Sequence, residues 1–136
     1  MGNLSTTYGA ETQVFKVIND KYLSQIKPLI TNTCLSCHGE GKLSPWYRNF
    51  PFVRGYIDNH ISRAKEKLEM SQGVPFKGKG KQSDIFWSIT QSLENDRMPP
   101  FNFNIMHRDL KLSNVTKLKL INWFKQKRLI LLKEDL

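Results

Sequence analysis

Four stretches of the chain carry apolar residues at three- and four-residue intervals, the spacing that places side chains on one face of an α-helix. These stretches cover residues 11–30, 55–70, 84–95 and 114–131. The positions expected to face a core are, in chain order, Val14, Phe15, Ile18, Tyr22, Ile26 and Leu29, then Ile57, Ile61, Ala64 and Leu68, then Ile85, Phe86, Ile89 and Leu93, and finally Val115, Leu118, Ile121, Trp123 and Phe124. No stretch shows the strict alternation of a half-buried strand. The pattern therefore predicts an all-α fold of about four helices joined by long loops.

Proline and serine residues indicate where these helices begin or end. Pro28 predicts a kink or stop near the end of the first helix, because proline lacks the amide hydrogen that an inner helical position donates. Ser83 and Ser113 are expected N-caps of the third and last helices. The third helix should end before Met98, since a residue that precedes proline avoids helical geometry. The remaining segments, 39–52, 71–82 and 101–111, are expected to be loops.

The length of 136 residues favours one domain over the whole chain, with residues 1–10 as a flexible N-terminal segment. Hydrophobic residues make up 39% of the chain, as in an ordinary folded domain. No apolar run approaches the ~18 residues that suggest a membrane span. We therefore expect no transmembrane segment.

The chain is basic, with 21 Lys and Arg against 12 Asp and Glu and a formal charge of +9. Such a charge suits nucleic acid, an anionic membrane or an acidic partner protein. The basic residues are mostly lysines spread along the expected helix faces, and no nucleic-acid motif occurs. We therefore expect an acidic protein partner and no nucleic acid.

Both cysteines lie in the run Cys34-Leu35-Ser36-Cys37-His38. A Cys-x-x-Cys pair can be a redox dithiol, half of a zinc site or a covalent haem anchor. A zinc site needs further ligands at similar spacing, and a thioredoxin-like dithiol needs a βαβ context. The histidine that directly follows the second cysteine favours one covalently attached c-type haem. Cys34 and Cys37 would each add to one vinyl group, and Nε2 of His38 would be the proximal iron ligand.

Met98 is the expected distal iron ligand. It follows the third helix, and Pro99 and Pro100 stiffen its backbone. A thioether binds iron weakly, so a stiff loop that presents it lowers the ordering cost.

Other residues could also approach the haem. His107 is the second choice for the distal ligand, whereas Met70 and Met106 are expected to pack in the core. His60 is expected to be exposed. Trp46 and Tyr47 could pack on the haem or simply cover the core. Arg97 is a candidate partner for a propionate, because arginine pairs with carboxylates in bidentate geometry. Lys42, Arg48 and Arg54 are further candidate partners for the propionates.

The chain resembles the bacterial haem-binding domain family of short exported monohaem c-type proteins. The resemblance rests on C-L-S-C-H at 34–38, P-W-Y at 45–47, H-I-S-R-A-K-E-K-L-E-M-S at 60–71, M-P-P at 98–100, M-H at 106–107, L-S at 112–113 with a following helix, and I-N-W at 121–123. These pieces extend over roughly residues 29–125. The resemblance implies one covalent haem, His38 and Met98 as its axial ligands, an all-helical fold and a periplasmic or envelope location.

Two functions follow from a haem in this chain. The first is electron transfer without enzymatic activity, because a haem with both a His and a Met ligand has no open position for a substrate. The second is a gas or redox sensor, or a peroxidase-like protein, whose distal ligand is labile. A third interpretation leaves the thiols of Cys34 and Cys37 unmodified, as in a non-haem thiol or metal protein. Covalent attachment indicates the periplasm, so we expect an export signal that this chain does not include.

Overall fold

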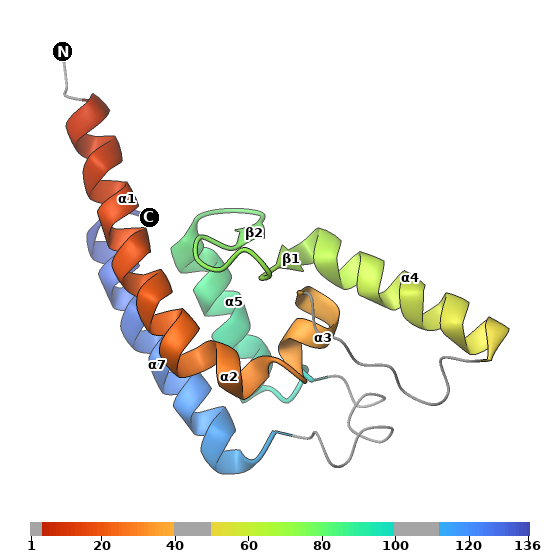
Figure 1. Cartoon of the computed structure of the whole chain (residues 1–136). Coiled ribbons are helices and arrows are strands. Elements are labelled where there is room, and N and C mark those ends of the chain that lie inside the picture. Colours follow the sequence, from red (N-terminus) through yellow and green to blue (C-terminus); the bar gives the residue numbers. More distant parts are fainter. Residues whose placement is uncertain (1–3, 40–49, 100–111) are drawn as a thin grey trace.

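The computed structural model describes residues 4–39, 50–99 and 112–136, and it is mostly helical (Figure 1). Its elements are, in chain order, α1 (Leu4–Lys21), the π-helical turn η1 (Tyr22–Ile26), α2 (Lys27–Ile30), α3 (Cys34–His38), α4 (Pro51–Lys67), β1 (Leu68–Glu69), β2 (Lys77–Gly78), α5 (Gln82–Glu94) and α7 (Asn114–Lys133). The predicted all-α class is confirmed. The sequence pattern showed no sign of β1 and β2, which make a small two-stranded antiparallel sheet.

The first helix is longer than predicted. It begins at Leu4 rather than at residue 11, so it includes most of the segment that was expected to be flexible. Pro28 does not end it, because η1 interrupts the α-helical hydrogen bonding just before the proline and α2 continues to Ile30. A wider turn leaves room for the proline ring, which would clash with the carbonyl four residues earlier in a regular helix. The buried stripe is Ile18, Tyr22, Ile26 and Ile30. Leu29, which was predicted to be in the core, is exposed.

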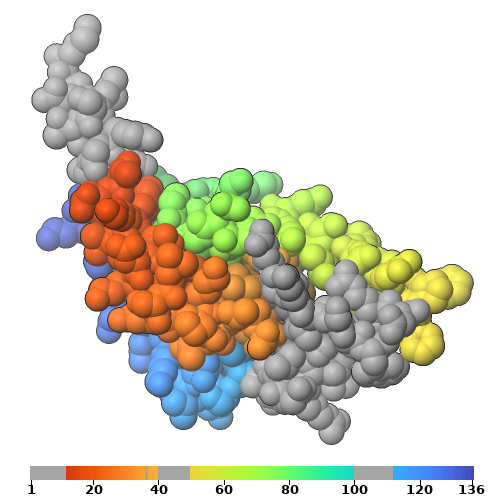
Figure 2. Space-filling model, viewed as in Figure 1, coloured from red at the N-terminus to blue at the C-terminus, as the bar shows by residue number. Residues whose placement is uncertain are grey.

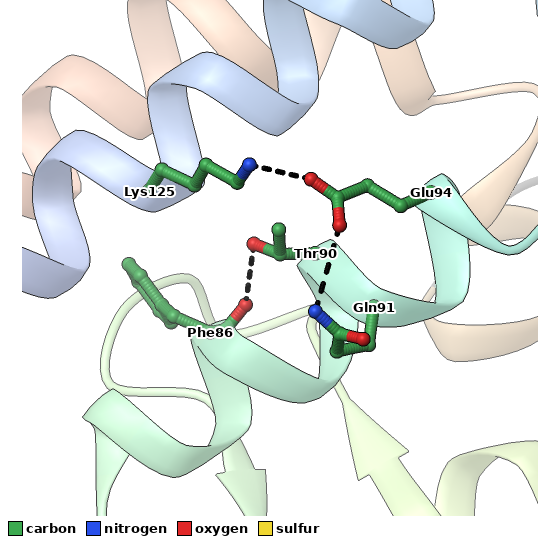
Figure 3. A network of polar contacts seen from close by, with 5 residues as sticks. All are labelled: Phe86, Thr90, Gln91, Glu94 and Lys125. Carbon is green, nitrogen blue, oxygen red and sulfur yellow. Dashed lines mark hydrogen bonds and ion pairs between the residues drawn. The ribbon is translucent and has the colours of Figure 1, made fainter.

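Helices α5 and α7 pack against each other, and η1 lies beside α7. The core between them is aromatic: Phe86 and Phe124 meet edge to face at 5.1 Å, and Tyr22 meets Phe76 in the same way at 5.1 Å. Figure 3 shows polar contacts at this packing, where Nζ of Lys125 lies 2.5 Å from a carboxylate oxygen of Glu94. The predicted core positions of α5 are buried or partly buried.

Two predicted core positions of α7 are wrong. Val115 and Leu118 are exposed, whereas Leu120 and Leu131 are buried. Apolar residues occur on every side of this helix, so their spacing alone did not identify the face that α5 covers. Ser113 caps α7 as predicted, because its Oγ accepts a hydrogen bond from the amide of Thr116 at 3.1 Å.

The start of α5 also differs from the prediction. The helix begins at Gln82, and Ser83 lies inside its first turn rather than at the cap. The amide of Ser83 donates instead to the carbonyl of Leu136, and its carbonyl accepts from Nε of Arg128. The side chain of Gln82 bonds both the amide and the carbonyl of Phe76, which fixes the loop before α5.

Helix α4 begins at Pro51 and ends at Lys67, earlier at both ends than the predicted 55–70. It ends because Leu68 is extended, with φ −156° and ψ 118°, and starts the hairpin. The apolar residues predicted to face the core from this helix are only half-buried: Ile57, Ile61, Ala64 and Leu68. Figure 1 shows α4 extending away from α1, α5 and α7, and Figure 2 shows its yellow end projecting from the body of the molecule. Among the described residues, no helix is both long and apolar enough to cross a membrane.

Candidate functional site

Helix α3 carries the Cys-x-x-Cys-His run between α2 and α4. Leu35 is buried and anchors this short helix in the core. Cys34 and Cys37 are both half-buried. The side chain of Thr33, directly before α3, hydrogen-bonds the carbonyl of Ile30, so the turn into α3 is held by the end of α2.

A cavity of about 590 Å³ brings three of the predicted site residues together, namely Cys34, His38 and Met98. Its other described lining residues come from α2, the end of α4, the hairpin, α5 and α7: Ile30, Glu66, Lys67, Leu68, Met70, Lys79, Ile85, Ser88, Ile89, Ser92, Leu93, Leu120 and Phe124. Most of these side chains are apolar, and the volume is in the range of protein sites for small molecules and cofactors. The described wall therefore suits a large, mainly apolar ligand.

The ring of His38 is oriented by the end of α4. Its Nδ1 lies 3.0 Å from the carbonyl oxygen of Ala64 and 2.9 Å from that of Leu68. Both partners are acceptors, so Nδ1 must carry a hydrogen, and in the neutral ring the lone pair is then on Nε2. A backbone carbonyl on the other ring nitrogen is the usual second partner of a histidine that binds a metal. The carbonyl of His38 also accepts a hydrogen bond from the amide of Met70 at 2.6 Å.

The thiol of Cys34 lies in an apolar environment. Burial raises its pKa to about 11, so the thiol is protonated at neutral pH. A protonated thiol is a poor metal ligand and a poor redox nucleophile. Among the residues that the structure describes, no group of three or more His, Cys, Asp or Glu side chains could hold a metal ion by itself. Cys37 is not among the described residues that line the cavity.

Met98 lies in the turn that follows α5, and about a third of its surface is exposed. The amides of Arg97 and Met98 both donate to the carbonyl of Ser92, at 2.9 and 3.2 Å. The carboxylate of Asp96 pairs with Lys117 of α7, so α7 also restrains this turn. These contacts hold Met98 at the cavity from a segment that is distant in sequence from α3.

The other predicted residues are placed as follows. Met70 is buried, as predicted, but it also lines the cavity. His60 is exposed, as expected, and packs on Tyr56 with ring centres 4.4 Å apart. Arg97 is exposed and, among the described residues, is not part of the cavity lining. Arg54 is exposed on α4. The remaining predicted residues lie outside the described residues: Lys42, Trp46, Tyr47, Arg48, Met106 and His107.

Sequence reasoning missed two parts of this site. The carbonyls of Ala64 and Leu68 could not be found, because a backbone acceptor leaves no signal in the side chains. Lys67 and Lys79 line the cavity, although the pattern indicated only a solvated helix face and a flexible loop. The short alternation of Lys and Gly at 77–81 was the one local signal for Lys79.

A family model described as a haem-binding domain matches residues 5–126, which is most of the chain and includes every described residue that lines the cavity. No curated protein and no solved structure matches the chain.

Proposed function

Because the chain belongs to the haem-binding domain family, it is a haem protein, and we propose that its haem is of the c type and carries single electrons in the periplasm. The observation that carries this proposal is the cavity shared by Cys34, His38 and Met98. These residues belong to two segments that are about sixty positions apart in sequence, yet they border one space of suitable size and polarity.

The covalent step uses the two thiols of α3. The S–H group of each cysteine adds across a vinyl double bond, so that sulfur bonds to one vinyl carbon and hydrogen to the other. No atom leaves, and the protein gains the mass of one complete haem. The product is an uncharged thioether. It suits the apolar surroundings of Cys34, because no charged group has to be buried there.

His38 and Met98 are the proposed axial ligands. Nε2 of His38 is available because the carbonyls of Ala64 and Leu68 occupy Nδ1. Met98 is preferred over Met70 as the distal ligand. The amide of Met70 donates a hydrogen bond to the carbonyl of His38, so the backbone of Met70 lies on the same side of the cavity as the proposed proximal ligand. Met98 approaches from the end of α5 instead.

Electron transfer follows from this ligand set. A bound haem supplies one-electron redox chemistry at its iron, and methionine ligation raises the reduction potential. If His38 and Met98 both held the iron, no site would be left for a substrate, so we propose an electron carrier rather than an enzyme. The net charge of +9 would steer an acidic redox partner to the protein. Covalent haem attachment also underlies the proposed periplasmic location.

The test uses protein matured in a host with haem-attachment machinery. Intact mass should show one added haem, and replacing both Cys34 and Cys37 with alanine should abolish this covalent addition. The ferric protein should show the near-infrared band of methionine-bound low-spin iron. Met98→Ala should remove that band, whereas Met70→Ala, the matched control at the same cavity, should keep it. An unmodified mass would refute the c-type proposal, and a band that persists in Met98→Ala would refute the ligand.

A sensor or peroxidase-like function is the second candidate, and the exposure of Met98 favours it. A side chain with 37% of its surface exposed has few packing contacts that hold it in place. Carbon monoxide binding to the reduced protein at neutral pH separates the two functions. Rapid binding, at a rate that Met98→Ala does not increase, would support the sensor. Slow binding that becomes fast in Met98→Ala would support the electron carrier.

A further inference from the structure

Three charged residues stand out among the apolar side chains that line the cavity: Glu66, Lys67 and Lys79. Lys67 is the last residue of α4, and Lys79 directly follows β2. Both lysines are exposed, so they lie where the cavity meets solvent. We propose that Lys67 and Lys79 bind the two ionised propionates of the haem. This inference rests on the haem position given in the proposed function.

The hairpin register brings the two lysines together. Leu68 pairs with Gly78 and Glu69 pairs with Lys77, so continuing the antiparallel register by one residue sets Lys67 opposite Lys79. The backbone is also close at this point, because a Cβ built on Gly78 would lie 3.1 Å from the carbonyl oxygen of Lys67. Like charges directly across a hairpin are destabilising. A pair of carboxylates between them would turn this repulsion into attraction.

Several other lysines already have acidic partners within the protein. Lys81, Lys117 and Lys125 form ion pairs with carboxylates, as the close contact of Lys81 with Asp135 at 2.5 Å illustrates. Lys65 and Lys77 lie near the carboxylate of Glu69 and help to lower its pKa. Within the described part of the chain, no ion pair involves Lys67 or Lys79. They are therefore the lysines at the cavity that remain available for an external anion.

This assignment fixes the direction of the haem in its cavity. The propionate edge would lie at the end of α4 and the hairpin, where charge meets solvent. The vinyl edge would lie toward the apolar surroundings of Cys34. Glu66 would lie beside the propionates and reduce the local positive charge, so the two lysines are needed to balance the carboxylates. Arg97, which the sequence suggested for this role, is not among the described lining residues.

The first experiment labels exposed amines of the unmodified, haem-loaded protein and measures the rate at each lysine by peptide mass spectrometry. Lys119 is the control, because it is exposed on α7, does not line the cavity and, among the described residues, forms no ion pair. Lys67 and Lys79 should react more slowly than Lys119, since an amine bound to a carboxylate is a weaker nucleophile. Equal rates at the three lysines would overturn the proposal.

The second experiment compares Lys67→Gln and Lys79→Gln with Lys65→Gln and Lys77→Gln, which remove the same charge from neighbouring positions. In protein with ¹³C-labelled haem propionates, the carboxyl resonances should shift in the first two variants and remain in place in the two controls. The reduction potential should also fall further in the first two. Identical spectra for Lys79→Gln and Lys77→Gln, with one haem present by mass, would overturn the propionate assignment alone. Absence of the added haem mass would instead overturn the proposed function together with this inference.

Discussion

Replacing Gly73 with alanine tests how the β1–β2 hairpin is attached to α1. Gly73 has a φ of +74°, and a Cβ at this position would overlap with Oδ1 of Asn19. That oxygen accepts a hydrogen bond from the amide of Val74 at 2.8 Å. A left-handed backbone costs an L-residue roughly 1–2 kcal/mol. Displacing Asn19 would leave a buried amide unsatisfied, which costs about 1–3 kcal/mol. We therefore expect Gly73→Ala to lower the free energy of unfolding by about 2–5 kcal/mol.

Two other glycines provide controls that separate these effects. Gly80 has a φ of +89°, but its added Cβ would lie 3.4 Å from Asp84 in ordinary contact. Gly80→Ala should therefore cost only the backbone strain, about 1–2 kcal/mol. Gly55 lies inside α4 with nothing near its added Cβ, so Gly55→Ala should stabilise the protein by about 0.5–1 kcal/mol. Guanidinium unfolding of the haem-loaded proteins, followed by far-ultraviolet circular dichroism, gives all three values.

A double-mutant cycle decides whether the contact with Asn19 is the cause. In an Asn19→Ala background the acceptor is already gone, so Gly73→Ala should cost no more than the strain measured at Gly80. If Gly73→Ala costs the same in both backgrounds, the proposed overlap with Asn19 is wrong.

Three smaller changes test single contacts, each by the same unfolding measurement. Tyr22→Phe should leave stability unchanged or raise it, because the buried hydroxyl of Tyr22 has no hydrogen-bond partner among the described residues, and a large loss would reveal one. Ser113→Ala should cost about 1 kcal/mol by removing the cap on the amide of Thr116, and Ser113→Asn should restore most of it. Glu94→Gln should cost less than about 1 kcal/mol, and high salt should abolish the difference, because its ion pair with Lys125 is only partly buried.

The sequence predicted helices best where one stripe is apolar and the opposite face is polar. In the first helix Ile18, Tyr22 and Ile26 were identified correctly. In α7 the prediction failed at Val115 and Leu118, because this helix is apolar on several sides and the position of α5 decides which side is buried. The hairpin was missed for a different reason. Strands of two residues are too short to show alternation, and they depend on long-range contacts such as the one between Asn19 and Val74.

Some residues of the candidate site could be predicted from local sequence, whereas others depend on contacts between distant parts of the chain. The spacing of Cys34, Cys37 and His38 is local, so the motif could be recognised without any structure. Met98 required an argument about the stiffness of a distant loop, and the structure adds that this loop borders the same cavity as α3. The lysines at the cavity depend on the hairpin register, which the sequence did not predict.

The end of α4 connects these parts of the site. One turn of chain around Leu68 supplies the carbonyls that orient His38, starts the strand that sets Lys67 opposite Lys79, and contributes an apolar side chain to the cavity. The helix must therefore end at Lys67 for the proximal histidine and the charged edge of the cavity to be positioned together. Had α4 continued to Met70, as the apolar spacing predicted, the carbonyl of Leu68 would point along the helix axis toward later amides. The early end of α4 is thus a requirement of the proposed haem site.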